Sequence, residues 1–348
     1  MQTTIIQITD LSAQAADIAA AAKVIRDGGL VVFPTETVYG LGGDATNAEA
    51  SRKIYAAKGR PSDNPLIIHV AEPRDAEPYA VTDALYYRLA EAFMPGPLTV
   101  IMPRRETIPL STTGGLESVA VRCPSHPVAH ALIAAAGVPI AAPSANLSGK
   151  PSPTCASHVI DDLSGRVDVI IDGGESEIGL ESTIVKIDRD ERGEYLTLLR
   201  PGGITYDALC CVWDRVVIAP AVTEQLSKDA RPLSPGMKYK HYAPKTPVVL
   251  LDGRPDSVLN YLRGRQAVEK CVILCYDEEA PFLRDERLLP VGRRDDLALH
   301  AHTLFARLRE SDVFDADVVY AHLPPMEGLG LALYNRMIRA AAHTIRKV

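Results

Sequence analysis

The chain has 348 residues, of which 47% are hydrophobic and 23% charged, and these values exclude a disordered, collagenous or fibrous protein. This length corresponds to about two domains. With 37 Lys and Arg against 44 Asp and Glu, the formal net charge is −7, which argues against a protein that coats RNA or DNA through bulk charge.

The first 207 residues alternate short apolar runs with helical stretches. A hairpin turn near residue 190, together with crossover helices, implies a twisted mixed sheet with parallel and antiparallel pairs. Helices are predicted over 13–27 and 48–57, the second with a capping box made by Thr46 and Glu49. The predicted strands are rich in β-branched residues and bounded by Gly, Pro or Asp, and they cover 30–33, 66–70, 98–102, 119–121, 139–142, 167–171 and 184–187.

The amino-acid composition of the chain changes after residue 207. Residues 231–247 contain four prolines, four Lys or Arg and no acidic residue, and we place an extended linker at 208–247. Beyond it, strands and helices alternate, which predicts a smaller Rossmann-like α/β domain over 248–348. Its strands are predicted at 248–251, 271–275 and 318–320, and its helices at 256–262, at 297–308 and from 331.

Five polar loops, each stiffened by Gly or Pro, border the predicted strands of the first domain. Loops at strand ends are where open α/β sheets bind ligands. Residues 1–207 hold 17 basic and 26 acidic residues, so cations concentrated in these loops indicate a focused anion site. The loops cover 34–43, 58–65, 121–124, 143–149 and 181–183 (with 200–202), and their cations are Lys58, Arg60, Arg122 and Arg200.

Each loop also has a plainer interpretation. The segment 34–43 is equally consistent with a tight turn. Lys58 and Arg60 follow a predicted helix, where cations complement the helix dipole. A buried Arg122 requires an anionic partner, which is either a carboxylate of the protein or one of a substrate.

Several other classes of protein are disfavoured. No apolar run approaches the ~20 residues that span a bilayer, and the N-terminus lacks the features of a secretory signal. Six cysteines are too few for a disulfide scaffold, so we expect a cytoplasmic protein. His126 and His130 lack the intervening Glu of a zinc protease and are predicted to lie on a helix surface. Cys271 and Cys275 point to one face of a strand, which favours two core cysteines over a redox pair.

Four motifs of the first domain occur in a characteristic order. They are Thr35-x-Thr37-x-Tyr39-Gly40-Leu41, Lys58-x-Arg60, Pro143-Ser144-Ala145-Asn146-x-Ser148-Gly149 and Glu181-Ser182-Thr183. Together they resemble the YrdC-type family of threonylcarbamoyl-AMP synthases. The linker at 234–244 and the Rossmann-like tail resemble the long, two-domain form of that family. One departure is Met94 before Pro95-Gly96-Pro97, where the family often carries Trp.

The resemblance implies a nucleotidyltransferase that condenses L-threonine, bicarbonate and ATP to threonylcarbamoyl-AMP and pyrophosphate. The product would serve N6-threonylcarbamoyladenosine formation at position 37 of tRNAs that read ANN codons, through a downstream transfer complex. The resemblance also implies Mg²⁺ bound with ATP, no organic cofactor and no metal motif of the protein itself. Direct tRNA binding is expected to be weak or absent, and no membrane is involved.

The resemblance further assigns residues to two substrates. The ATP site is expected to contain Lys58, Arg60, Asn64, Ser118, Ser144, Asn146, Ser152, Arg200 and Tyr242, with Lys58 and Arg60 also catalytic. The L-threonine site is expected to contain Thr37, His69, Arg122, Ala142 through its backbone, and Ser182, with Arg122 on the substrate carboxylate. Linker residues 238–242 are expected to close over the pocket as a lid that excludes water.

Two alternatives remain at this point. The first is a module that binds double-stranded RNA without catalysis. The second is a related carbamoyltransferase of the hydrogenase-maturation type, although such chains carry zinc-finger and acylphosphatase segments that this sequence lacks.

Overall fold

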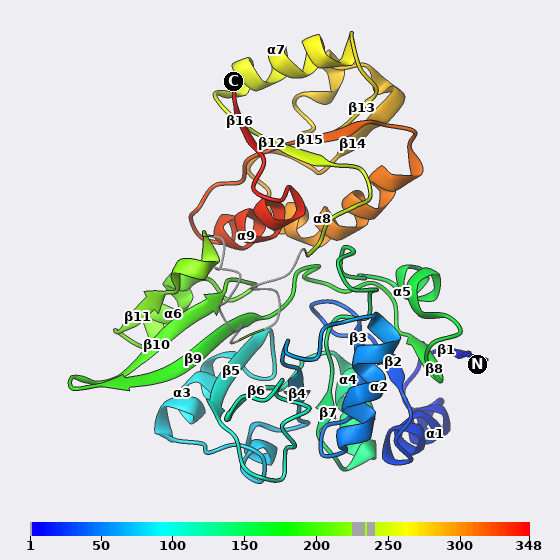
Figure 1. Cartoon of the computed structure of the whole chain (residues 1–348), viewed down its shortest axis with the longest axis vertical. Helices are drawn as coiled ribbons and strands as arrows, with labels where there is room; N and C mark the ends of the chain where they lie inside the picture. The colour runs from blue at the N-terminus through cyan, green and yellow to red at the C-terminus, as the bar shows by residue number, and fades with distance from the viewer. Residues whose placement is uncertain (1, 225–233, 235–240) are drawn as a thin grey trace. The chain divides into compact units, whose positions relative to one another are not determined.

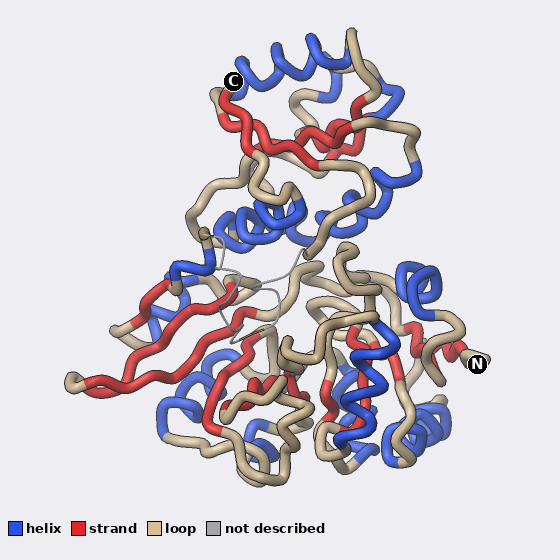
Figure 2. Tube along the Cα trace, in the orientation of Figure 1, coloured by secondary structure: helices blue, strands red, loops and turns tan. Residues whose placement is uncertain are grey.

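Two separate sheets organise the chain (Figures 1 and 2). The computed structural model describes residues 2–224, 234 and 241–348. The first unit comprises Met1–Ser148, Ser152–Glu177 and Glu181–Lys238. The second comprises Gly149–Pro151, Ile178–Leu180 and Tyr239–Val348.

The sheet of the first unit has eleven strands among the described residues, in the order β1-β8-β2-β3-β7-β4-β6-β5-β9-β10-β11. Its pairs are both parallel, as in β4 with β6, and antiparallel, as in β9 with β10, which confirms the predicted mixed sheet and the hairpin near residue 190. The strands are β1 (Thr4–Gln7), β2 (Val31–Phe33), β3 (Gly40–Asp44), β4 (Ile67–His69), β5 (Leu98–Pro103), β6 (Ser118–Arg122), β7 (Ile140–Ala141), β8 (Val169–Asp172), β9 (Thr183–Asp190), β10 (Gly193–Arg200) and β11 (Val216–Ile218).

Helices pack on both faces of this sheet. Buried residues of α1 (Ala15–Arg26) and α4 (Pro127–Ala136) share one core cluster with Phe33 and Ile140. A Cβ on Gly42 would point to Phe33 and Ile140, whereas one on Gly43 would meet Ile54 and Ala50 of α2 (Ala48–Lys58). Because successive strand residues point to opposite faces, α2 covers the other face. The remaining helices are α3 (Ala84–Phe93), α5 (Ala156–Leu163) and α6 (Tyr206–Val212).

The Gly-rich segment 34–43 is only partly a loop, because Gly40–Asp44 form strand β3 beside β2. A Cβ on Gly42 would lie 2.7 Å from Ile140 Cγ2 and 2.8 Å from a ring carbon of Phe33. These distances are too short for any side chain. Sheet packing therefore requires Gly42 without reference to a ligand.

Two further predictions about the first unit need correction. The N-cap of α2 is Asn47, whose side chain accepts hydrogen bonds from the Glu49 and Ala50 amides, and the Thr46 hydroxyl instead donates to Asp44 Oδ1 at 2.7 Å. The segment after residue 207 was assigned to a linker. It instead completes α6 and adds β11, which pairs in parallel with β10.

The second unit is built on an all-parallel sheet with the order β14-β13-β15-β12-β16, which confirms the predicted Rossmann-like α/β architecture. In Figure 1, α7 lies on one side of this sheet and α8 and α9 lie on the other. The elements are β12 (Val248–Asp252), α7 (Pro255–Gln266), β13 (Cys271–Cys275), β14 (Leu288–Pro290), α8 (Leu297–Glu310), β15 (Val318–His322), α9 (Gly330–Ala340) and β16 (Ile345–Lys347).

Cys271 and Cys275 lie in one core cluster with Val258 and Leu262 of α7. Both are free thiols, and burial raises the pKa of Cys275 to about 12. The interpretation as core cysteines is confirmed. Within the described part of the chain, no helix is both long enough and apolar enough to cross a membrane.

Candidate functional site

Lys58 is the last residue of α2 and is buried at 2% exposure. Gly59 follows in the left-handed conformation and ends the helix, so the chain turns sharply after the lysine. The Lys58 ammonium donates to the backbone oxygens of Ser144 and of Asn146, the latter at 2.6 Å. The lysine therefore does more than complement its helix dipole, because it holds the loop that follows β7.

The loop at 144–146 is also held from within. The Ser144 hydroxyl donates to Asn146 Oδ1 at 2.5 Å, and this oxygen lies 3.3 Å from Lys58 Nζ. The backbone of Gly40 forms a bridge with Ser144, which ties the loop to β3. The structure thus brings together three predicted ATP-site residues from segments almost ninety residues apart.

Arg60 and Asn64 lie in the turn between α2 and β4. Arg60 Nη2 donates to the backbone oxygens of Asn64, at 3.3 Å, and Pro65, at 3.0 Å. The Tyr55 hydroxyl donates to Asn64 O at 3.1 Å, and burial raises its pKa to about 12, so this donor is retained at neutral pH. Arg60 and Asn64 are 9% and 2% exposed as residues, and these contacts fix the turn.

Three polar residues lie in one row across the middle of the first sheet. His69 of β4 pairs with Arg122 of β6, and Thr99 of β5 pairs with Arg122 from the other side. Residues in register on neighbouring strands point to the same face. All three residues are buried, and we call this row of His69, Arg122 and Thr99 the polar strip.

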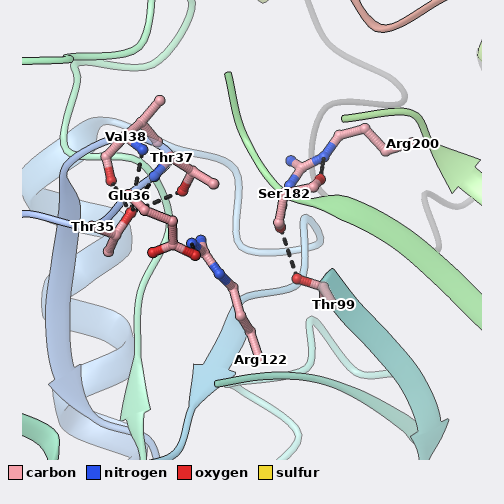
Figure 3. Close-up of polar contacts among 8 residues, drawn as sticks. All are labelled: Thr35, Glu36, Thr37, Val38, Thr99, Arg122, Ser182 and Arg200. Atoms are coloured by element: carbon pink, nitrogen blue, oxygen red, sulfur yellow. Dashed lines mark hydrogen bonds and ion pairs between the residues drawn. The ribbon is translucent and has the colours of Figure 1, made fainter. Parts of the chain in front are cut away.

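Arg122 is held by a carboxylate of the protein (Figure 3). Its Nη2 lies 2.6 Å from Oε1 of Glu36, and both residues are 4% exposed. From the sequence alone, the anionic partner of Arg122 is either a carboxylate of the protein or one of a substrate, and no role is predicted for Glu36. The available signal was that Glu36 is the one charged residue in the sequence between Leu30 and Asp44.

His69 is neutral. Burial, followed by the positive charge of Arg122, lowers its pKa to about 3. Its Nδ1 lies 3.2 Å from the backbone oxygen of Ile140 and donates to it, which leaves the lone pair on Nε2. At neutral pH this imidazole can accept a hydrogen bond but adds no positive charge.

The predicted residue Thr37 lies beside Glu36 and is fully buried. Its hydroxyl is 2.8 Å from that of Thr35, which also donates to Val38 O at 2.6 Å. These contacts order the backbone on both sides of Glu36 (Figure 3).

Ser182 connects two of the predicted substrate sites. Its hydroxyl is 2.8 Å from Thr99 Oγ1 and accepts from Arg200 Nη2 at 3.1 Å, while Arg200 Nε donates to Ser182 O at 3.0 Å (Figure 3). A Cβ on Gly202 would lie 2.5 Å from Thr183 N and 2.6 Å from Glu181 O. Glycine is therefore required for the backbone to cross here, and this crossing sets Arg200 against Ser182.

Ser152 donates to Glu181 Oε1 at 2.6 Å, in a second buried contact that the sequence did not predict. Ala142 follows β7 and donates its amide to Ile67 O at 2.9 Å. Ser118 lies apart from Arg122, at the other end of β6, opposite Pro103. Three strand residues lie between Ser118 and Arg122, which are therefore about 13 Å apart.

Tyr242 belongs to the second unit. Its ring stacks on Phe305 with centroids 5.2 Å apart, the Arg336 guanidinium lies 5.9 Å from it, and its φ is 64°. Lys238, Tyr239 and Lys240 lie outside the described residues. The lid and its nucleotide contact therefore stay predictions.

No group of three or more His, Cys, Asp or Glu that could hold a metal ion occurs in the described ranges. His126, predicted on a helix surface, is instead the N-cap of α4, where its Nδ1 accepts from the Val128 amide at 3.2 Å. His130 is partly exposed and lies 3.4 Å from Glu72.

Two family models match the chain. A model described as telomere recombination (Sua5, YciO and YrdC) matches residues 23–202, and the model of the threonylcarbamoyl-AMP synthase C-terminal domain matches residues 204–342. The chain is 43% identical to a threonylcarbamoyl-AMP synthase of Bacillus subtilis over 97% of this chain and 96% of the relative. It is 41% identical to that of Pyrococcus abyssi over 94% and 95%, respectively.

Similarity to a solved structure also extends over the whole chain. The crystal structure of Pyrococcus abyssi Sua5 in complex with L-threonine superposes with a TM-score of 0.89 at 39% identity, and the match covers all of both chains.

Proposed function

The chain belongs to the threonylcarbamoyl-AMP synthase family, and from this we propose that it is a nucleotidyltransferase that makes threonylcarbamoyl-AMP from L-threonine, bicarbonate and ATP. Relatives that match over nearly the whole chain carry this name, and a similar solved structure is a complex with L-threonine. Pyrophosphate is the second product.

The contact between Lys58 and the 144–146 loop carries this proposal. A lysine ammonium fixed beside backbone, hydroxyl and amide groups resembles the arrangements that hold nucleotide phosphates. Arg60 and Asn64 lie in the turn directly after it. We assign the triphosphate to this region, with Ser152, Arg200 and Ser118 as further contacts.

The reaction depends mainly on the alignment of the carbamate with the α-phosphate of ATP. The threonine amine first attacks the carbon of bicarbonate, and the loss of water leaves a carbamate. A carbamate oxygen then attacks the α-phosphate in line, and pyrophosphate leaves. Such a step gains most from fixed positive charge and from the orientation of two anions. Lys58 and Arg60 are both buried and held by backbone oxygens, so they are oriented before substrate arrives.

Threonine is assigned to the polar strip. Arg122 would bind its carboxylate, and the neutral His69 would accept a hydrogen bond through Nε2. Thr37, Ser182 and the Ala142 backbone complete this site. Mg²⁺ enters as part of MgATP, with phosphate and water oxygens as its ligands.

The wider role belongs to the same proposal. The product would pass to the transfer complex that modifies adenosine 37 of tRNAs reading ANN codons, with weak or no tRNA binding by this chain. A cytoplasmic location is supported by six free thiols.

The test is to incubate the protein with MgATP, L-threonine and bicarbonate. We expect threonylcarbamoyl-AMP by mass spectrometry and an equal amount of pyrophosphate, with neither formed when threonine is omitted. Failure to release pyrophosphate, together with salt-sensitive binding of double-stranded RNA, would instead identify an RNA-binding module.

A further inference from the structure

The ion pair between Glu36 and Arg122 is buried on both sides. The two side chains are each 5% exposed, and their charged atoms lie 2.6 Å apart. Glu36 lies between β2 and β3, and Arg122 ends β6, so the pair joins two separate segments of the sheet. Burying two charges costs desolvation energy that a single contact rarely offsets.

Each of the two charged groups has a polar atom that takes no part in the contact between them. Glu36 Oε2 and Arg122 Nε are both buried, and neither has a hydrogen-bond partner among the described residues. An arginine fork usually binds a carboxylate through two N–H groups, but here it uses one. Unsatisfied buried atoms of this kind are uncommon in folded proteins, and a bound group that completes them is one explanation.

The two unused atoms, Glu36 Oε2 and Arg122 Nε, require opposite kinds of hydrogen-bond partner. The carboxylate oxygen requires a donor, preferably a cation, and the Nε–H requires an acceptor, preferably an anion. The neighbouring His69 is neutral at pH 7, so it does not supply the missing cation. Figure 3 shows the carboxylate and the guanidinium facing one another, so the two unused atoms belong to one ion pair.

We infer that Glu36 binds the α-ammonium group of the amino-acid substrate through Oε2, while Arg122 binds its α-carboxylate through Nε. The Glu36–Arg122 pair is then a receptor for a zwitterion. The inference rests on the proposed function for the identity of that amino acid as L-threonine. Because both the pair and the zwitterion carry no net charge, binding brings no net charge into the buried site.

A comparison of two ligands tests the inference. One is L-threonine, and the other is the analogue in which a hydroxyl replaces the α-ammonium group, 2,3-dihydroxybutanoate of matching stereochemistry. Both carry the carboxylate, so any effect transmitted through Arg122 cancels in the ratio of their dissociation constants. Calorimetry without ATP measures both for the wild-type protein and for Glu36→Gln.

We expect the wild-type protein to prefer threonine. In Glu36→Gln, the Kd for threonine should rise roughly 10- to 100-fold, whereas the Kd for the analogue should change less than about threefold. Glu36→Asp keeps the charge and should retain the preference with weaker affinity. The matched control is Glu49→Gln, which neutralises a carboxylate that is 60% exposed and should alter neither Kd.

An unchanged ratio in Glu36→Gln, or a wild-type protein without a preference for threonine, would overturn the inference and leave Glu36 as a residue that only positions Arg122. Thermal unfolding shows whether the variant is folded. If it is not, the ratio for the wild-type protein decides the question, and equal dissociation constants for the two ligands overturn the inference. Threonine-dependent pyrophosphate release is measured separately on the wild-type protein, so its failure would count against the proposed function and not against the zwitterion site.

Discussion

The buried cations of the first unit are oriented by oxygen atoms of the chain itself. Lys58 and Arg60 donate to backbone carbonyls, Arg200 to the backbone and hydroxyl oxygens of Ser182, and Arg122 to the carboxylate of Glu36. Flexible side chains lose conformational entropy when they bind a ligand. Because these four are already fixed, a substrate that meets them avoids much of that loss.

The neutral state of His69 gives the fold an acid-sensitive residue. Its pKa in the folded protein is lowered to about 3, against 6.5 for the unfolded chain, because burial and Arg122 disfavour the imidazolium. Between these two values the unfolded chain binds a proton that the folded chain does not. The contribution of His69 to stability is therefore constant above pH 6.5 and falls as the pH drops toward 3.

We predict that His69→Asn removes this dependence. His69 contributes a slope of up to about 1.4 kcal/mol per pH unit to the free energy of unfolding, and asparagine does not titrate. Urea denaturation between pH 4.5 and 7.5 measures the slope for both proteins. Parallel curves for the variant and the wild-type protein would show that His69 is not the titrating group.

At the scale of elements, short strands bring distant loops together. The register of β4, β6 and β5 alone places His69, Arg122 and Thr99 in one row. The crossing of the β10 exit over the segment before β9 then adds Ser182 and Arg200. The backbone at this crossing is so close that it accommodates no side chain at Gly202.

We predict that Gly202→Ala lowers both activity and stability. The added Cβ would force Arg200 and Ser182 apart, with a loss of about 1–3 kcal/mol in stability and at least tenfold in the rate of pyrophosphate release. Gly264→Ala in α7 is the control, because no atom beyond its chain neighbours and its own helix backbone lies within 4 Å of the added Cβ. It should stabilise the protein by roughly 0.5–1 kcal/mol and leave the rate unchanged. An equal rate in both variants would contradict the role of the crossing.

Local sequence patterns predicted the elements that have strong periodicity. The β13 strand was predicted to the residue, and α2 and α8 were predicted to within two residues, because their apolar spacing is clear. The segment 208–222 was misassigned because α6 has seven residues and β11 has three, too few to show a period. In β3, glycines required by packing resembled those of a loop.

The same distinction applies to the site. Lys58, Ser144 and Asn146 were predicted from motifs, and the structure joins them. Glu36 was not, because its partner Arg122 is 86 residues away and no local pattern connects them. A pairing of this kind becomes visible only when the strand order of the sheet is known.

Although the whole molecule has a net charge of −7, it contains a group of buried cations. Lys58, Arg60, Arg122 and Arg200 are each at most 9% exposed and all belong to the first unit. The second unit contributes a separate parallel sheet and holds Tyr242 within it. Chemistry on two small anionic substrates does not require a basic surface, so the acidic average and the proposed reaction are compatible.

Whether these buried cations carry the reaction is decided by a single assay. The rate of threonine-dependent pyrophosphate release is compared for the wild-type protein, Lys58→Ala, Arg122→Ala and the control Arg52→Ala, which removes a cation that is 63% exposed on the same helix as Lys58. We predict a loss of about 100-fold or more in kcat/KM for Lys58→Ala and for Arg122→Ala, the second mainly through the KM for threonine. Arg52→Ala should stay within twofold of the wild-type protein. Full activity in both Lys58→Ala and Arg122→Ala would contradict the assignment of the site.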